Sequence, residues 1–402
     1  MKFSKSCSLI LSGCLLAPLL SGCLGELFGN SKSQETPEQY LQRQQQERKA
    51  KEARFNAQQK QEVQKMAQLQ KKLGVGRGQE PQTAEEFFQE GLRVYENKDD
   101  AIMYRGIDGN DRRRREAERL FTKSAQKGYA EAYRYLGLMN RNKPNGNARR
   151  RAMEYFQTAA QKGSVEALVD LGKMYLPGES EEENDRHMGI PKDYAKAMEC
   201  FKQAAEKGSA RGAYNVGTMY ENAQGVPKDY KKALEYYQQA ANKGLPSAWT
   251  SLGNLYKLGL GISKNLAKAR EYYQKGADGG DASGAYFIGA FYYGGIGGPK
   301  DLAKAKEYFE KAIKADYTPA YLILGVMYLK GESVAKDYNK AKEYLEAAIG
   351  STDKEVASKA NFNLGVMYLN GDGVLVNKKQ ATEYMRKACD LGYEKACTTL
   401  SK

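Results

Sequence analysis

The chain has 402 residues, which is enough for two or three ordinary domains or for one long array of repeats. Hydrophobic residues make up 41% and charged residues 28%, so the composition permits a folded protein with much surface per residue. Lysine and arginine number 63 against 49 aspartate and glutamate, and the net charge of +14 favours an anionic partner or simply a soluble basic surface. The single histidine excludes a zinc site built from several histidines.

The N-terminus predicts an export signal. Lys2 and Lys5 precede an apolar stretch, residues 9–20, that is too short to span a bilayer comfortably. The stretch ends in the sequence LSGC at residues 20–23, which resembles the lipobox of bacterial lipoproteins. That resemblance implies cleavage before Cys23 and transfer of a diacylglycerol to its thiol. The alternative is an ordinary secretory signal followed by an unrelated cysteine.

The residues after Cys23 indicate to which membrane the lipoprotein is sorted. Leu24 and Gly25 follow it, with no aspartate, and under the enterobacterial sorting rule this pattern implies transfer to the outer membrane. Residues 1–22 are therefore predicted to be a lipoprotein signal peptide. The mature protein is predicted to be an outer-membrane lipoprotein whose folded part faces the periplasm, where nucleic acid is not an expected partner.

Residues 23–82 are predicted to form a tether. Glutamine, lysine, glutamate and arginine dominate from Gln34 to Lys72, and the apolar residues there are too sparse for a core and lack sustained heptads. The stretch is either disordered or a solvated helix, and in both cases it holds the folded part away from the membrane. A glycine-rich run at residues 74–78 then ends any helix; it is not a phosphate loop, because no strand precedes it.

From about residue 83 the chain repeats itself. The clearest marker, which we call the column glycine, follows an apolar residue and usually has an aromatic residue three positions later. It occurs at Gly137, Gly172, Gly217, Gly253, Gly289, Gly325 and Gly365. Glycine inside a helix costs about 1 kcal/mol relative to alanine. Its recurrence at one phase therefore predicts the close approach of a neighbouring helix.

Each repeat continues with a second helical pattern. In one repeat Asp229 precedes apolar positions at helical spacing, from Ala233 to Ala241, and Gly244 follows them. The aspartate can cap the start of the helix, and the glycine can end it in a left-handed turn. Each unit is therefore predicted to be helix A, a loop, helix B and a turn. A single pair of helices cannot bury both of its faces, so the units must stack.

This pattern resembles the Sel1-like repeat family, a relative of the tetratricopeptide repeat. The segments that carry the resemblance include AYNVGTMY at residues 213–220 and KALEYY at 232–237. It implies an all-α, right-handed solenoid of stacked helix pairs with a concave surface for protein contacts. The resemblance is close over residues 128–401 and weak before them. We therefore predict a divergent capping helix pair at 83–127 and a Sel1-like solenoid at 128–402, with an acidic insertion at 178–187.

Three of the six cysteines lie beyond the predicted signal and Cys23. Cys389 falls in a helix B column and Cys397 in the next helix A column. Residues 387–397 resemble the paired-cysteine repeat of the Helicobacter cysteine-rich proteins, and this resemblance implies a disulfide between Cys389 and Cys397. An oxidising periplasm permits the bond, and two buried free thiols are the alternative. The remaining cysteine, Cys200, is interpreted as a small core residue.

Two arginine runs are candidate anion-binding sites. Both lie at or just before the start of a helix B, in adjacent units, so they are expected to share one edge of the solenoid. The ligand would be a polyanionic polysaccharide, peptidoglycan or a lipid head group, and a solvated, partly glutamate-paired surface is the alternative. The runs consist of Arg112, Arg113, Arg114, Arg115, Arg149, Arg150 and Arg151.

No motif predicts a metal or a cofactor. His187 lies in the acidic insertion without ligand spacing, so it is interpreted as a solvated loop residue. A glycine run at residues 294–298 imitates a phosphate loop, but it falls at an interhelix turn with no strand before it.

We predict a non-enzymatic, lipid-anchored periplasmic scaffold that binds proteins of the cell envelope. Sel1-like outer-membrane lipoproteins that support exopolysaccharide secretion are one instance of that role. The cysteine-rich relatives have been called β-lactamases or penicillin-binding proteins, so an enzyme is the second hypothesis. Ser124, Ser333 and Ser351 each have the required lysine three residues on, but no Lys-Thr-Gly element follows them. A binder of peptidoglycan or acidic polysaccharide is the third.

Overall fold

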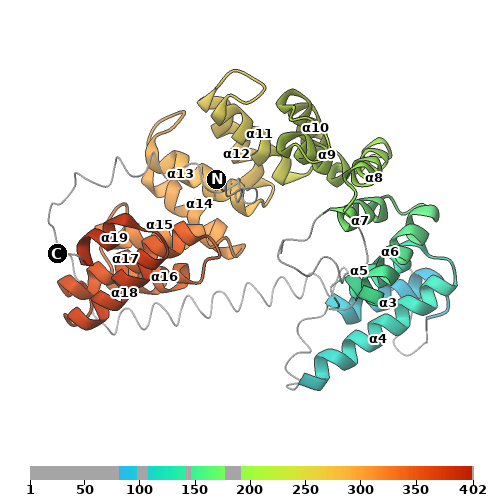
Figure 1. Cartoon of the computed structure of the whole chain (residues 1–402), viewed down its shortest axis with the longest axis horizontal. Helices are drawn as coiled ribbons and strands as arrows, with labels where there is room; N and C mark the ends of the chain where they lie inside the picture. The colour runs from blue at the N-terminus through green and yellow to red at the C-terminus, as the bar shows by residue number, and fades with distance from the viewer. Residues whose placement is uncertain (1–80, 97–106, 142, 144–145, 177–191, 401–402) are drawn as a thin grey trace, which may run out of the picture. The chain divides into compact units, whose positions relative to one another are not determined.

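The structure is a computed structural model that describes residues 81–96, 107–141, 143, 146–176 and 192–400 (Figure 1). The predicted signal peptide, Cys23, nearly all of the tether, and the acidic insertion with His187 lie outside these residues. Within the described ranges the secondary structure is helical and contains no strand.

The described residues divide into two compact units. The unit that ends at Cys200 contains α3 (Ala84–Glu96), α4 (Ile107–Gln126), α5 (Ala130–Arg141), α6 (Gly146–Gln161), α7 (Val165–Tyr175) and the start of α8 (Tyr194–Glu206). The unit that begins at Phe201 contains the rest of α8, followed by α9 (Ala210–Asn222), α10 (Tyr230–Asn242), α11 (Pro246–Leu258), α12 (Leu266–Asp278), α13 (Ala282–Gly294), α14 (Leu302–Lys314), α15 (Pro319–Lys330), α16 (Tyr338–Ile349), α17 (Lys354–Asn370), α18 (Lys378–Asp390) and α19 (Glu394–Leu400).

Consecutive helices pack in pairs (Figure 1). In the C-terminal unit helix A of each pair (α9, α11, α13, α15 and α17) packs against the helix B that follows it, and helix B then packs against the next helix A. In the N-terminal unit α3 pairs with α4 and α5 with α6. The predicted all-α solenoid of helix pairs is therefore confirmed.

The column glycines let the two helices of a pair approach closely. A Cβ atom on Gly253 would lie 2.6 Å from the ring of Tyr273 in helix B, which is closer than real Cβ contacts. The same holds at Gly137, Gly217, Gly289 and Gly325, so the predicted close approach is confirmed there. Gly91 in α3 is a further member of this series, because its Cβ would lie 2.7 Å from the ring of Phe121.

Helix B begins at a capping side chain. The carboxylate of Asp229 accepts a hydrogen bond of 3.0 Å from the backbone N–H of Lys232. Gly244, just beyond the other end of that helix, has φ +86°, a left-handed conformation that favours glycine. Both predictions for this helix are confirmed. The same cap is formed by Asn265, Asp301, Asp337 and Asn377.

The aromatic column of helix A packs against helix B. In the C-terminal unit a tyrosine of helix A meets a tyrosine of helix B in each pair, as where the Tyr292 and Tyr308 rings stack with centroids 5.8 Å apart. Cys200 occupies the position that Tyr236 has in the next repeat. Its free thiol is half-buried, and burial raises its pKa to about 11. Because the thiolate is the reactive form, we interpret Cys200 as an unreactive packing residue.

Candidate interaction surface

Each helix A has a further set of positions beside the column glycine, at the margin of its contact with helix B. It contains the positions three residues before, one residue after and four residues after the column glycine. These positions are related as i, i+4 and i+7, so they share one side of an α-helix. We call this set in the C-terminal unit the helix A face. It consists of Tyr214, Thr218, Glu221, Thr250, Asn254, Lys257, Tyr286, Ala290, Tyr293, Leu322, Val326, Leu329, Phe362, Val366 and Leu369.

The helix A face continues from one repeat to the next. The hydroxyl of Ser251 in α11 donates to the Tyr214 hydroxyl of α9 at 3.3 Å. The hydroxyl of Tyr293 in α13 donates to the carboxylate of Glu332, just beyond α15, at 2.6 Å. Helices α15 and α17 pack against each other directly. Side chains of successive repeats therefore lie next to one another along this surface.

The part of the face on α9 contains a half-buried carboxylate. The Tyr237 hydroxyl, from helix B of the same pair, donates to Glu221 at 2.5 Å. Burial raises the pKa of Glu221, and the hydrogen bond from Tyr237 opposes this shift only in part. The pKa of Tyr237 is itself raised well above its usual value, by burial and then by the nearby carboxylate. The carboxylate of Glu221 and the hydroxyl of Tyr237 thus satisfy each other by a hydrogen bond.

On α11 the face contains a buried lysine. Lys257 is only 8% exposed, and burial lowers the pKa of its amine to about 8. Its Nζ lies 5.0 Å from the centroid of the Phe287 ring in α13. Within the described part of the chain it forms no ion pair or hydrogen bond. Lys275, on the neighbouring helix B, instead pairs with Glu271 at 2.7 Å.

On α15 and α17 every position of the face is apolar. Phe362 and Val366 pack against the last hydrophobic cluster, and the Phe362 ring meets Tyr393 with centroids 5.0 Å apart. Leu369, one turn further on, is 44% exposed. In the loop after α17, Leu375 is 90% exposed. Leu369 shares one side of α17 with Phe362 and Val366, and contiguous apolar side chains that reach solvent mark surfaces that contact other proteins.

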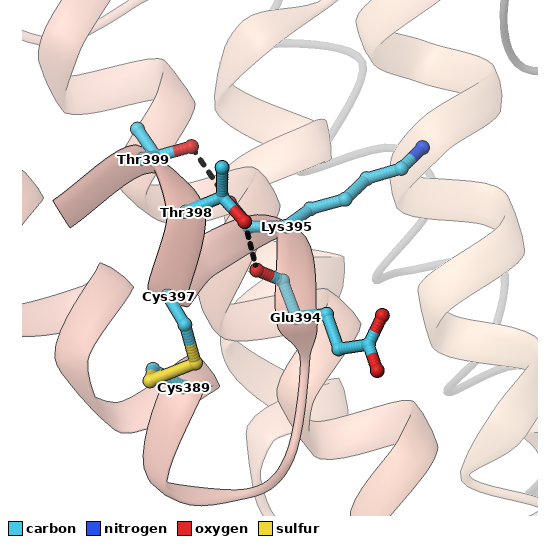
Figure 2. Close-up of a disulfide and its surroundings, with 6 residues drawn as sticks. All are labelled: Cys389, Glu394, Lys395, Cys397, Thr398 and Thr399. Atoms are coloured by element: carbon cyan, nitrogen blue, oxygen red, sulfur yellow. Dashed lines mark hydrogen bonds between the residues drawn. A yellow bond between two sulfur atoms is a disulfide. The ribbon is translucent and has the colours of Figure 1, made fainter. Parts of the chain in front are cut away.

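A disulfide joins the last two described helices, α18 and α19, beside this apolar part. Cys389 in α18 and Cys397 in α19 are joined, with their Cα atoms 4.9 Å apart (Figure 2). Figure 2 also shows the Thr398 and Thr399 hydroxyls, which donate to backbone carbonyls one turn earlier in α19. The bond fixes the short last helix on helix B, and Tyr393 lies in the turn that it encloses.

The arginine runs lie in α4 and α6, in the N-terminal unit. The guanidinium of Arg114 donates to the carbonyl oxygen of Met139 at 2.6 Å, so this side chain caps the end of α5. The Nε atom of Arg149 is buried and has no hydrogen-bond partner among the described residues. Arg115, Arg150 and Arg151 are exposed. The side chain of Arg112 lies outside the described residues, and anion binding by the two runs stays a prediction.

The serines that could imitate a β-lactamase nucleophile have other surroundings. Ser124 is fully buried, and its hydroxyl donates to the carbonyl oxygen of Ala84 at 2.5 Å. Ser351 accepts a hydrogen bond from the backbone N–H of Asp353 in the turn before α17. In the described ranges, no group of three acidic, cysteine or histidine side chains is placed to hold a metal. None of the described helices has the length and apolarity to cross a membrane.

Comparison with models of known protein families assigns the repeats to one family. The Sel1 repeat model matches eight segments, which together span more than half of the chain: residues 101–129, 130–164, 165–209, 210–245, 250–281, 282–317, 318–350 and 358–393. The chain belongs to the Sel1 repeat family. The first match overlaps the predicted capping pair at 83–127, so that pair too contains Sel1 sequence.

Two solved structures with TM-scores above 0.5 support this assignment, and a third similar chain covers less of the sequence. The protective antigen c5321, present in uropathogenic Escherichia coli strains, is 28% identical over 83% of this chain and 66% of its own, with a TM-score of 0.57. A Sel1 repeat protein from Oxalobacter formigenes is 26% identical over 84% of this chain and 90% of its own, with a TM-score of 0.54. Helicobacter pylori cysteine rich protein B is 29% identical over 31% of this chain and 88% of its own, with a TM-score of 0.26. No curated protein matches the sequence significantly.

Proposed function

We propose that this Sel1 repeat protein is a lipid-anchored scaffold of the cell envelope that binds a partner protein along its helix A face. Sel1 repeat proteins are protein–protein interaction scaffolds. The observation that carries the proposal is the apolar part of the face on α15 and α17, which ends in Leu369, 44% exposed. A packed core does not require the exposed side chain of Leu369, whereas a protein partner would cover it.

The anchor rests on the sequence of the N-terminus. Cys23 follows an apolar stretch and the lipobox-like residues 20–22. Several acyl chains give stable membrane attachment, whereas one chain binds marginally. Changing Cys23→Ser should therefore move the protein from the membrane fraction to the soluble fraction and remove the mass of the lipid. Unchanged fractionation and mass would refute the lipoprotein interpretation.

The binding surface is tested by site-specific photo-crosslinking in intact envelopes. A benzoylphenylalanine at position 369 should give an adduct with a defined partner, because this position lies at the exposed end of the apolar part. The matched control is the same group at position 271, which is 57% exposed on helix B of another repeat. Adducts only from position 271, or the same adducts from both, would show that the partner does not use the helix A face.

An enzymatic role has less support. The buried hydroxyl of Ser124 is engaged by Ala84, and its neighbour Ala125 belongs to the core. We therefore expect the purified mature chain to hydrolyse a chromogenic cephalosporin no faster than buffer does. Repeated turnovers that are abolished by Ser333→Ala or Ser351→Ala would contradict the scaffold function.

A further inference from the structure

Lys257 departs from the chemistry of its neighbours along the face. The position four residues after the column glycine holds a tyrosine-paired carboxylate in α9, and leucine in α15 and α17. In α11 it holds a lysine of which 8% is exposed. The amine must therefore be stabilised by what surrounds it, because little water reaches it.

The surroundings supply only part of that stabilisation. A buried ammonium group normally requires an anion or several hydrogen-bond acceptors. In the described part of the chain Nζ faces the ring of Phe287, whose π electrons attract a cation weakly. No carboxylate contributes to the lowered pKa of Lys257, which follows from burial alone. The ammonium group therefore still needs an anion.

The acids along this surface are already engaged. Asp281 accepts hydrogen bonds from Thr250, from the Ser283 hydroxyl and from the backbone N–H of Gly284. Glu332 accepts from Tyr293 and pairs with Lys330 at 3.5 Å. The carboxylate of Glu221 is held by Tyr237. Lys257 is thus a cation for which the neighbouring repeats provide no carboxylate.

We propose that Lys257 binds a carboxylate of the partner protein, on a segment that also places apolar side chains against α15 and α17. This proposal rests on the scaffold function and specifies the chemistry of the partner. Three steps between neighbouring helices, at about 9 Å each, separate α11 from α17. An extended segment of about eight residues spans that distance at about 3.3 Å per residue. The partner segment is therefore an extended stretch with an acidic group at one end and apolar residues at the other.

Two fluorescein-labelled peptide pools test this proposal with the full mature chain. Each pool has about twelve residues drawn from leucine, phenylalanine, valine and serine, and one pool has a fixed glutamate where the other has glutamine. By fluorescence anisotropy the wild type should bind the glutamate pool about tenfold more tightly, as expected for one charge-assisted contact. Lys257→Met should remove this difference, whereas Lys275→Met, which changes an exposed lysine, should keep it.

The outcomes separate the two proposals. If the wild type binds both pools equally well, the lysine contact is refuted and the scaffold function stands. If it binds neither pool, the helix A face is not a peptide-binding surface and both proposals fail. Acetate that displaces the glutamate pool no better than chloride supports a contact in which the whole segment takes part, whereas full displacement by acetate shows a simple anion site and overturns the proposal. Far-UV circular dichroism checks the fold, and Lys257→Gln replaces Lys257→Met if that variant does not fold.

Discussion

The helix A face contains different chemistry at its two ends on the same backbone. On α9 and α11 it contains Glu221 and Lys257, two ionisable groups whose pKa values are shifted by burial. On α15 and α17 the same positions contain Leu329 and Leu369. Column glycines and capped helices B recur at both ends. The positions between paired helices are therefore fixed by the fold, whereas the helix A face, which we propose binds the partner, varies from repeat to repeat.

The largest expected effect belongs to the core beneath the apolar end. Leu364 in α17 is fully buried, so Leu364→Ala should destabilise the protein by about 2–5 kcal/mol through lost burial and the cavity left behind. Leu369→Ala removes the same atoms from an exposed site and should cost less than about 0.5 kcal/mol. Urea unfolding with amide hydrogen exchange measures both. Equal losses would mean that Leu369 belongs to the core rather than to a binding surface.

The disulfide should support the apolar end alone. Replacing Cys389 and Cys397 by serine removes the closure of a short loop, which should cost about 2–3 kcal/mol. Repeats couple mainly to their nearest neighbours, so faster hydrogen exchange should appear in α18 and α19 and should not extend to α9 and α11. A uniform increase over the whole C-terminal unit would contradict this local role.

Removing the buried charge of Lys257, at the α9–α11 end of the helix A face, should stabilise the protein. The folded-state pKa of Lys257, about 8, lies below the usual lysine value, so the unfolded chain binds more protons between the two values. Below about pH 8 the wild type carries the full penalty of a buried cation, and Lys257→Met should raise the free energy of unfolding by about 1–3 kcal/mol. The gain should shrink as pH rises through 8 toward the usual lysine pKa of about 10.4, and Lys275→Met should give no gain. Lower stability of Lys257→Met at pH 7 would show that the ammonium is satisfied within the chain.

The smallest effect concerns Glu221. Burial raises the pKa of Glu221 above its usual value, so the folded state binds the proton more tightly than the unfolded chain does. Its contribution to stability is present below the usual pKa and is lost as pH rises through the raised value. Glu221→Gln keeps an acceptor for Tyr237 and should be about 1 kcal/mol more stable at pH 7, with little difference near pH 4. The control is Glu271→Gln on an exposed helix B site, and an identical pH profile for wild type and Glu221→Gln would refute the assignment.

The sequence predicted the fold well because its constraints are local. A column glycine, a capping aspartate and a glycine turn each recur at a fixed distance along the chain. Gly91 was missed because Glu90 precedes it, whereas every glycine of the predicted column follows an apolar residue. Its contact with Phe121 is nevertheless of the same kind. The buried environment of Lys257 could not be predicted, since Phe287, which lies below its Nζ, is supplied by another repeat. For the same reason the sequence could not show that Arg114 reaches the carbonyl oxygen of Met139.

The regular spacing of the column glycines makes the length of the protein adjustable. Gly217, Gly253, Gly289 and Gly325 are separated by 36 residues each, and the helices B between them begin with the same cap. Removing residues 282–317, one whole repeat, would leave α12 followed by α15, with a column glycine and a capped helix on each side of the junction. Gain or loss of a repeat by gene duplication or deletion would thus lengthen or shorten the surface in whole steps. The array could thus match a partner of another size while each repeat keeps its column glycine and its helix cap.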